Sequence, residues 1–507
     1  MADNNNHIPS VYRPRKITVA RAIGYGMPDM MGGGAFTLIG AWLLFFWTTY
    51  AGLTAMEAAS ILAIARVADA VISLFMGAIT DNLYRFKIGK KFGRRHFFLL
   101  IGSPLMLEFI LLWITGLNYW YYLISYVLFE LVAAMVLIPW ETLPTEMTED
   151  YNKRTMLSTA RLVISSGSSF LATFLPGQLF KIFGEDNPMS YTFNAIVFAV
   201  IYMVSVFIAY KTTWERQITP EMAAKLEAKA KEGAGRTFGE QLKAYIATVK
   251  LRTFRKHLIV YLCTFTAKDT FNAVFAYFVV SVLGLSAGVS SGVLSLNIIG
   301  LPLTILVGYL LVKFSPRWVW CVGIVVELVA LVGFWVLSGT SMNDLTMWLY
   351  VVGLVYNIGL GAVIATPWNV FPMIPDLDEL VSGEHHEGLY ASVMTFVRKS
   401  TVAVATFVVG LVLTEGGYVE GQIEQSVGTQ HTITGILVFG TGALLLVALL
   451  TAVTFRLNKT THTVVKDELN RLRNGGHKDD APKETRELIE KLTGTKWEHI
   501  WATNPNQ

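Results

Sequence analysis

Charged residues are scarce in this sequence: they make up 15% of its 507 residues, whereas 53% are hydrophobic. A soluble globular chain carries about 25% charged residues. The deficit excludes an ordinary soluble domain, because so many apolar side chains need an apolar solvent as well as an apolar core. The chain also has only two cysteines, Cys263 and Cys321, and both lie within apolar runs. A disulfide framework is therefore not expected.

Other signatures are missing as well. Basic residues occupy short segments between apolar runs rather than one face of a soluble domain, so no nucleic-acid partner is expected. The sequence has no Gly-rich phosphate loop, no paired acidic loop motif and no cluster with metal-ligand spacing. We therefore expect neither an enzyme nor a bound cofactor or metal. The N-terminus is polar and then basic, which does not fit a removable signal peptide.

What the sequence has in abundance is long apolar runs. A bilayer core about 30 Å thick needs roughly 20 apolar residues in a helix. Twelve runs reach this length, near 30–50, 54–80, 97–116, 119–143, 158–181, 191–211, 257–283, 290–313, 318–338, 347–372, 390–414 and 431–455. The sequence thus predicts an all-α membrane protein with twelve transmembrane helices.

The runs fall into two sets of six. We expect an N-terminal six-helix half (1–211), a cytoplasmic linker with a surface helix (212–256), a C-terminal six-helix half (257–455) and a cytoplasmic tail without chemistry of its own (456–507). Lys and Arg are concentrated in alternate loops, which places both termini in the cytoplasm. The expected location is the plasma membrane, the inner membrane of a bacterium. Two six-helix halves suit a transporter in which one half rocks against the other.

Several charged residues lie inside the apolar runs, where burial of charge is costly and marks functional candidates. In the second run Arg66 and Asp69 are three residues apart, so they share a helix face. A desolvated Asp69 can accept a proton near neutral pH, or it can serve as an oxygen ligand for Na⁺. The alternative is a purely structural salt bridge between Arg66 and Asp69. We favour the coupling role.

Two further spans carry charges of interest. Asp29 lies in GYGMPDMMGGG, where the glycines and the proline predict an irregular, ligand-facing backbone. The alternative is a solvated Asp29 in a bent helix. In the eleventh run Arg398 and Lys399 are adjacent, so they point to different helix faces and need different partners. We expect one to pair with an aspartate and the other to bind substrate, unless Arg398 reaches out to the membrane surface.

The seventh run contributes Lys268 and Asp269, which we assign with Arg66 to a charge network, and Asn272, a candidate hydrogen-bonding group in a cavity. The alternative for Lys268 and Asp269 is a structural pair in which the two charges neutralise each other locally. Trp140 and Trp368 occupy similar places, in LIPWETLP and ATPWNVFP, at the ends of the fourth and tenth runs. Sugar rings have apolar faces that stack on aromatic rings, so both tryptophans are candidates for substrate contact. Packing beside a helix-ending proline is the alternative.

At these residues the chain resembles the glycoside–pentoside–hexuronide:cation symporters, the melibiose permease family within the major facilitator superfamily. The resemblance covers most of residues 20–455. It is most specific in RVADA, IPWETLPTEMTED…KRT…AR, FPMIPDLDELVSGEHHEGLY and FVRKS, and GAITD…GRR is similar to the general facilitator loop. The resemblance implies the major facilitator fold and cation-coupled sugar uptake. By position it implies a cation-site role for Asp69, sugar-site roles for Asp29 and Arg161, and a central role for Lys399.

The sequence departs from that family at informative positions. Ser73 stands where sodium-using members often carry a second aspartate, and Leu137 stands where melibiose permease binds galactosides through an aspartate. A threonine of the sodium site aligns near Ala134. Glu130, one helical turn earlier, offers a replacement carboxylate. We therefore expect proton coupling through Asp69, with Glu130 and Ser73 beside it, and Na⁺ as the alternative coupling ion.

Arg398, added beside the central lysine, predicts an anionic substrate together with Arg161, because guanidinium groups pair well with carboxylates. The expected function is a symporter that imports a sugar or glycoside, with a uronate-type glycoside or oligosaccharide as its acidic form. The expected partners are this substrate, the coupling cation and membrane lipids. Three different functions also fit the sequence: a sodium-coupled carrier of lysolipids or other amphiphiles, a non-transporting membrane sensor, and an enzyme that transfers sugar to lipid.

Overall fold

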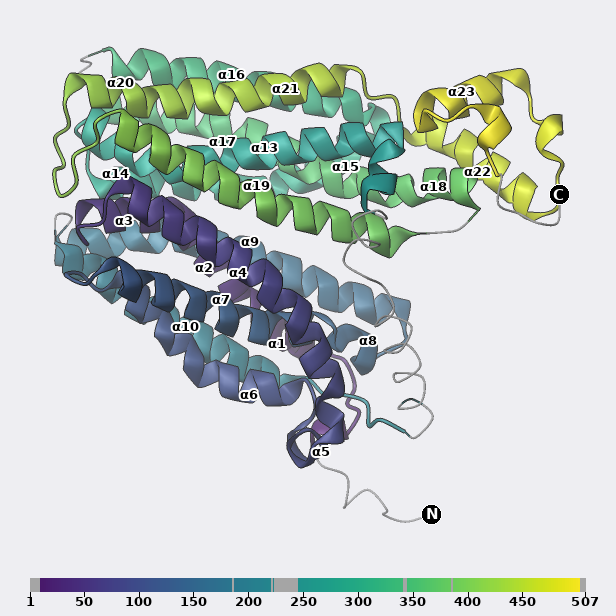
Figure 1. The fold of residues 1–507 in the computed structure, drawn as a ribbon, viewed down its shortest axis with the longest axis horizontal. Helices are drawn as coiled ribbons and strands as arrows, with labels where there is room; N and C mark the ends of the chain where they lie inside the picture. Colours follow the sequence, from purple (N-terminus) through teal and green to yellow (C-terminus); the bar gives the residue numbers. More distant parts are fainter. Residues whose placement is uncertain are drawn as a thin grey trace. The chain divides into compact units, whose positions relative to one another are not determined.

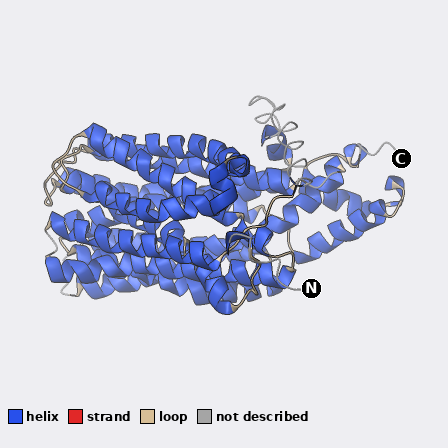
Figure 2. Ribbon diagram, turned by 90° about the horizontal axis from the view of Figure 1, so that it is seen from below, coloured by secondary structure: helices blue, strands red, loops and turns tan. Residues whose placement is uncertain are grey.

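The computed structural model describes residues 10–184, 187–219, 222, 245–340, 344–383 and 386–501, and within these ranges it is helical throughout, with no strand (Figures 1 and 2). The helices that precede residue 220 are α1 (Val19–Gly26), α2 (Asp29–Leu38), α3 (Leu44–Thr49), α4 (Ala55–Asn82), α5 (Lys87–Phe92), α6 (His96–Leu105), α7 (Tyr119–Glu141), α8 (Leu143–Met147), α9 (Tyr151–Phe183) and α10 (Pro188–Thr212). The predicted surface helix in the linker lies outside the described residues.

The helices that follow are α13 (Arg252–Tyr277), α14 (Ala287–Leu294), α15 (Gly300–Lys313), α16 (Pro316–Ser338), α17 (Leu345–Val370), α18 (Ile374–Ser382), α19 (Glu387–Glu415), α20 (Val427–Gly435), α21 (Thr441–Val453), α22 (Lys459–Arg473) and α23 (Lys483–Thr493). Short π or 3₁₀ turns join some of them into longer rods, such as Ile39–Leu43 between α2 and α3 and Ile436–Gly440 between α20 and α21.

Ten helical segments within the described residues are long and apolar enough to cross a membrane. The remaining two predicted spans, 158–181 and 257–283, coincide largely with α9 and α13, which are 33 and 26 residues long but carry more polar residues. The protein is therefore a multi-pass membrane protein, and the number twelve stays a prediction. The first span begins at Val19, earlier than the predicted residue 30, because the charged and Gly-rich start of the segment is helical too.

The ends of these helices follow from local sequence signals. Thr54 and Glu57 form a capping box that satisfies free backbone N–H groups at the start of α4. Asp150 accepts hydrogen bonds from the backbone N–H groups of Asn152 and Lys153 at the start of α9, and Gly184 ends that helix with a positive φ of 95°. Polar caps thus mark where long apolar helices begin, between the predicted runs.

Helix α16 has one exposed apolar face and one face that is buried against other helices. Valines recur along one exposed face of the helix, at positions 322, 325, 329, 332 and 336. The opposite face, which includes Trp320, Ile324 and Phe334, is buried against α17 and α21. Spacings of three and four residues place each set on one side of a helix. An exposed all-valine stripe of this length needs an apolar solvent, which supports the membrane assignment.

Contacts between residues divide the chain into two units. Unit 1 comprises Met1–Ala228, Asp269–Ile298 and Val402–Leu437, and unit 2 comprises Lys229–Lys268, Ile299–Thr401 and Val438–Gln507. Unit 1 thus contains the first six predicted spans together with the C-terminal ends of α13 and α19 and the helices α14 and α20. The predicted boundaries describe the order of segments along the chain, and they stay a prediction: 1–211, 212–256, 257–455 and 456–507.

The tail folds against unit 2. It forms the helices α22 and α23, which lie beside α18 (Figure 1). Two nitrogens of Arg473 donate hydrogen bonds to the carboxylate of Glu379 on α18, at 2.7 and 2.6 Å. A further hydrogen bond joins the ring of His462 to Asp376 at 2.8 Å. The tail is therefore an ordered part of unit 2.

Candidate functional site

A break in the first span positions Asp29. Helix α1 ends at Gly26, and α2 begins at Asp29 after Pro28. The predicted irregular backbone is thus present. A Cβ atom on Gly32 would lie 2.6 Å from Oδ1 of Asp29, so only glycine at that position leaves room for the carboxylate. Asp29 itself is buried, with 5% of its surface exposed.

Arg161 of α9 is the partner of Asp29. Its Nε donates a hydrogen bond to Oδ2 of Asp29 at 2.8 Å, and its Nη2 donates another to Oε1 of Glu141 at 2.7 Å. The guanidinium stands 4.6 Å from the ring centre of Trp140. Arg161 is 32% exposed and Glu141 is 48% exposed. One guanidinium is thus held by a buried carboxylate on one side and reaches an accessible carboxylate on the other.

Trp140 packs against this pair. Its ring is fully buried and stacks on Tyr25 with ring centres 5.3 Å apart, and its Nε1 donates a hydrogen bond to the carbonyl oxygen of Tyr25 at 2.7 Å. The structure therefore places Trp140 against Arg161, not on an open surface. Its observed contacts fix the position of the guanidinium by a cation–π interaction.

A second cluster surrounds Arg66 on α4. Its Nη1 lies 3.1 Å from Oε1 of Glu130 on α7, and its guanidinium stands 4.8 Å from the ring centre of Phe36. Asp69 and Asp269 act on the same guanidinium electrostatically. The direct ion pair of Arg66 is thus with Glu130, rather than with Asp69 as a salt bridge within one helix would require. Three carboxyl groups share the field of one cation, so the cluster favours binding of another positive charge.

Asp69 is nearly buried in this cluster, with 6% of its surface exposed. The hydroxyl of Ser73, one turn along α4, donates a hydrogen bond to Oδ1 of Asp69 at 3.0 Å. Ser73 thus supplies a neutral donor where a second carboxylate would add a negative charge. Across the described residues no group of three His, Cys, Asp or Glu side chains is arranged to hold a metal ion.

The predicted residues of α13 and α19 are half-buried. Asp269 and Asn272 are half-buried on the part of α13 that belongs to unit 1, and Lys268 is half-buried at the end of the part that belongs to unit 2. Arg398 and Lys399 are half-buried on α19 within unit 2. Their roles stay predictions.

Unit 2 holds an aromatic group around two predicted residues. The guanidinium of Arg398 stands 5.4 Å from the ring centre of Phe265. Trp368 is 55% exposed and packs edge-on against Tyr261 and Phe265, with ring centres 5.8 and 6.5 Å apart. Trp368 is therefore accessible to a ligand, unlike Trp140.

Sequence reasoning gave no role to Tyr25, Tyr261 or Phe265, and it counted Glu141 only among the charged candidates inside the apolar runs. A signal for Glu141 was present: PWETLP and PWNVFP share the pattern Pro-Trp-x-x-x-Pro, which brackets the same turn in both halves of the chain. The aromatic partners had no such signal, because they are contributed by helices distant in sequence and by residue types that are common in membrane spans.

A network of hydrogen bonds joins helix ends in unit 1. The hydroxyls of Thr48 and Tyr277 are 2.7 Å apart, and those of Thr49 and Tyr418 are 3.3 Å apart. The backbone N–H of Gly421 donates to the carbonyl oxygen of Thr48 at 3.0 Å. These residues flank loops that are poor in Lys and Arg. Because the positive-inside rule predicts that such loops face outward, we name this set of five residues the outer ties.

Glu215 organises the opposite ends of the unit 1 helices, beside the basic loop. Its carboxylate accepts hydrogen bonds from the backbone N–H groups of Arg94, Arg95 and His96 at 3.1, 2.9 and 2.6 Å. The same carboxylate lies 2.9 Å from Nδ1 of His96. Burial alone would raise the pKa of Glu215, but these bonds, led by that of the His96 ring, hold the pKa below its usual value. Both arginines also pair with Glu146.

Comparisons with known proteins agree with this architecture. The family described as MFS/sugar transport protein matches residues 24–459. The glucuronide carrier protein homolog of Escherichia coli is 25% identical over 82% of this chain and 86% of its own length. The isoprimeverose transporter of Lactiplantibacillus pentosus is 23% identical over 83% of this chain and 88% of its own. The crystal structure of the nucleoside transporter NupG superposes with a TM-score of 0.59 at 13% identity, over 86% of this chain and all of that one, which shows the fold alone.

Proposed function

This chain belongs to the MFS/sugar transport protein family, and we propose that it is a proton-coupled symporter that imports an acidic, uronate-type glycoside by alternating access. The observation that carries the proposal is the pairing of Arg161 with both an accessible carboxylate, Glu141, and a buried one, Asp29. We further propose that it acts as a carrier and not as an enzyme, in the plasma membrane, with both termini in the cytoplasm.

The substrate step follows from the geometry of Arg161. Glu141 is half exposed, so its ion pair with Arg161 is worth roughly 0–1 kcal/mol. A substrate carboxylate of the same charge and shape can displace Glu141 at little cost and take the Nη2 donor. Asp29 stays in place and accepts hydrogen bonds from sugar hydroxyls. The carrier protein homolog named for glucuronide supports an acidic substrate, whereas the isoprimeverose transporter is a relative named for a disaccharide without a carboxylate.

The coupling step follows from the cluster around Arg66. Asp69 shares that cation with Glu130 and Asp269, so uptake of one proton reduces mutual repulsion among the carboxyl groups. The hydroxyl of Ser73 donates to Asp69, and because a hydroxyl can either donate to a carboxylate or accept from a carboxylic acid, it can stay in contact with Asp69 in both protonation states. If proton and substrate stabilise the same conformation, their affinities rise together by an equal factor.

Alternating access also needs an outer end that opens and closes. The outer ties join the end of the first span to the ends of α13 and α19 through neutral hydrogen bonds. Each bond is worth about 1 kcal/mol net. A few such bonds hold an outer gate closed and still let substrate and proton binding reverse the balance, because a shift from 1:99 to 99:1 needs about 5.5 kcal/mol.

The test is uptake by purified protein in proteoliposomes. A glucuronide and its neutral glucoside counterpart are supplied with an inward pH gradient, an inward Na⁺ gradient, or neither. We expect the glucuronide to accumulate only with the pH gradient and the glucoside to enter at least tenfold more slowly. Accumulation driven by Na⁺ alone would replace the proton with Na⁺, and equal uptake of both glycosides would remove the role of Arg161 in charge selection.

The same preparation separates sugar symport from lipid transport, sensing and sugar transfer. A lysolipid carrier would lose sugar uptake to micromolar lysophosphatidylcholine and would transport that lipid. A sensor would bind glycoside without counterflow. A sugar-transferring enzyme would convert the glycoside, which chromatography of the recovered sugar would reveal.

A further inference from the structure

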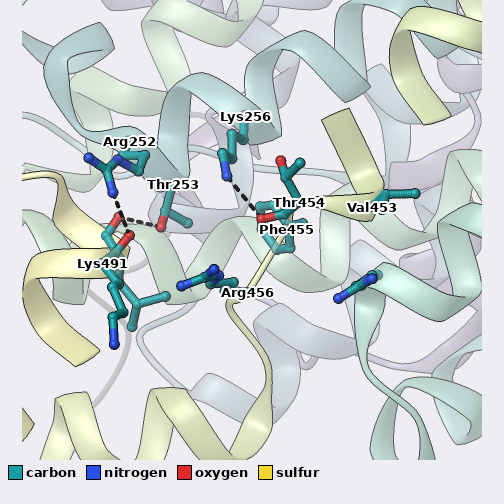
Figure 3. A pocket seen from close by; sticks show the side chains of 10 residues that line it. Arg252, Thr253, Lys256, Val453, Thr454, Phe455, Arg456 and Lys491 are labelled. Atoms are coloured by element: carbon teal, nitrogen blue, oxygen red, sulfur yellow. Dashed lines mark hydrogen bonds between the residues drawn. The ribbon is translucent and has the colours of Figure 1, made fainter. Parts of the chain in front are cut away.

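A cavity of about 320 Å³ opens in unit 2 at the ends of three helices. It lies between the start of α13, the start of α16 and the end of α21, and the tail helix α23 closes one side. Figure 3 shows side chains of α13 and of the segment after α21 around this space. Five of its ten lining residues are cationic and none is acidic: Arg252, Lys256, Arg317, Arg456 and Lys491.

Only one of the five cations of this cavity has an acidic partner within the described residues. Lys491 has Glu487 at 3.5 Å. In the part of the chain that the structure describes, the other four lining cations form no ion pair. Lys256 also feels the like charges of Arg252, Arg255 and Arg456. Five cations around one space create a positive local potential that attracts an anion.

Ordinary structural roles account for only part of the cluster. Nζ of Lys256 donates to the carbonyl oxygen of Thr454 at 2.9 Å and so caps the C-terminal end of α21. Nη1 of Arg252 lies 3.5 Å from the carbonyl oxygen of Lys491, which joins α13 to the tail. Arg317 and Arg456 have no comparable bond from their side chains within the described residues. The hydrogen bonds and ion pairs of the described residues therefore do not explain why these two arginines lie at the cavity.

The surroundings indicate where the anion comes from. Arg317 stands 5.7 Å from the ring centre of Trp318, and Trp318 is an exposed tryptophan at the end of a span. Such residues mark the level of the lipid headgroups. Val453, the last residue of α21, is exposed at the mouth of the cavity and offers an apolar surface for an acyl chain. Basic pockets between spans on the cytoplasmic side take anionic lipid headgroups.

We propose that this cavity binds the phosphate group of an anionic phospholipid, and that the bound headgroup fastens the tail helix α23 to the ends of α13 and α21. Arg317 and Arg456 contribute charge from two sides, while the hydroxyl of Thr253 holds α23 by donating to the carbonyl oxygen of Leu492 at 2.7 Å. The site is independent of the glycoside and of the coupling ion.

The test measures lipid binding to the full-length chain, freed of lipid in a neutral detergent, by calorimetric titration with dioctanoyl phosphatidylglycerol. Because each cation near an anionic lipid contributes about fivefold in affinity, Arg317→Gln with Arg456→Gln should weaken binding roughly twenty- to thirtyfold. Lys459→Gln with Lys483→Gln removes the same charge from exposed positions of the tail outside the cavity and should change affinity less than twofold.

Two further titrants separate the sources of the phosphate. Dioctanoyl phosphatidylcholine should bind at least tenfold more weakly than phosphatidylglycerol, and inorganic phosphate should bind weakly and compete with it. Inorganic phosphate that binds as tightly as phosphatidylglycerol, with the same loss in the double variant, would keep the anion site and overturn the lipid as its occupant. Unchanged binding by the cavity variant, an equal loss in the control variant, or equal binding of phosphatidylcholine would overturn the proposal.

Discussion

The pairing of Asp29 with Arg161 makes a prediction that a double-mutant cycle can measure. Asp29 is 5% exposed and its described partner is the guanidinium of Arg161 at 2.8 Å. Replacing Arg161 with Gln leaves the buried carboxylate without its cation and removes the cation–π contact with Trp140. Charged hydrogen bonds are worth about 1.5–3 kcal/mol, and a cation–π contact about 0.5–1 kcal/mol.

We therefore expect Arg161→Gln to lower the free energy of unfolding by about 2–4 kcal/mol. Asp29→Asn should be milder, because the exposed Arg161 keeps Glu141 and water. The double variant should recover about 1.5–2 kcal/mol relative to the sum of the single effects. The assay is thermal unfolding in detergent, followed by tryptophan fluorescence. Simple additivity of the two substitutions would refute the reasoning that the two side chains form one unit.

The remaining predictions concern the accessible carboxylate, the outer ties and the effect of pH. Glu141→Gln removes the group that competes with an acidic substrate for Arg161, so glucuronide affinity should rise by up to about fivefold. Titration calorimetry measures this affinity, and a decrease in affinity would contradict the prediction. Tyr277→Phe removes the hydroxyl that contacts Thr48, so the population of the outward-open conformation should rise about fivefold. Spin-label distances across the outer loops would measure that population, and an unchanged population would exclude the outer ties as a gate. Glu215 has a lowered pKa when folded, so its stabilisation is present above its unfolded pKa of about 4.3 and is lost as pH falls through the folded value. The melting temperature of Glu215→Gln should therefore fall less than that of the wild type between about pH 6 and pH 3, and parallel curves would refute this.

Much of the fold could be predicted because membrane spans are a local property of the sequence. Runs of apolar residues located the helices, and a cap such as Asp150 explains where one begins. The count of spans was less secure, because α9 and α13 carry polar residues that lower their apolar character.

The site was only partly predictable, because the local sequence does not determine which side chains of different helices pair with each other. The spacing of Arg66 and Asp69 allowed a salt bridge within α4, whereas the packing of α4 on α7 gives Arg66 the nearer partner Glu130. Trp140 was a candidate either for stacking on a sugar ring or for packing beside a helix-ending proline, and its contacts with Tyr25 and Arg161 leave it buried. The break in the helix at Asp29 was predicted from the glycines and the proline around it, which are a local signal.

The central claim is that Asp69 couples a proton to glycoside transport, and the most direct measurement compares Asp69→Asn with the wild type in proteoliposomes. The variant mimics a permanently protonated carboxyl group, so glucuronide counterflow should persist while accumulation driven by an inward pH gradient is lost. Ser73→Ala, which removes only the hydrogen bond to Asp69, serves as the matched control and should keep accumulation with a shifted pH dependence. Gradient-driven accumulation by Asp69→Asn at the wild-type level would contradict the account.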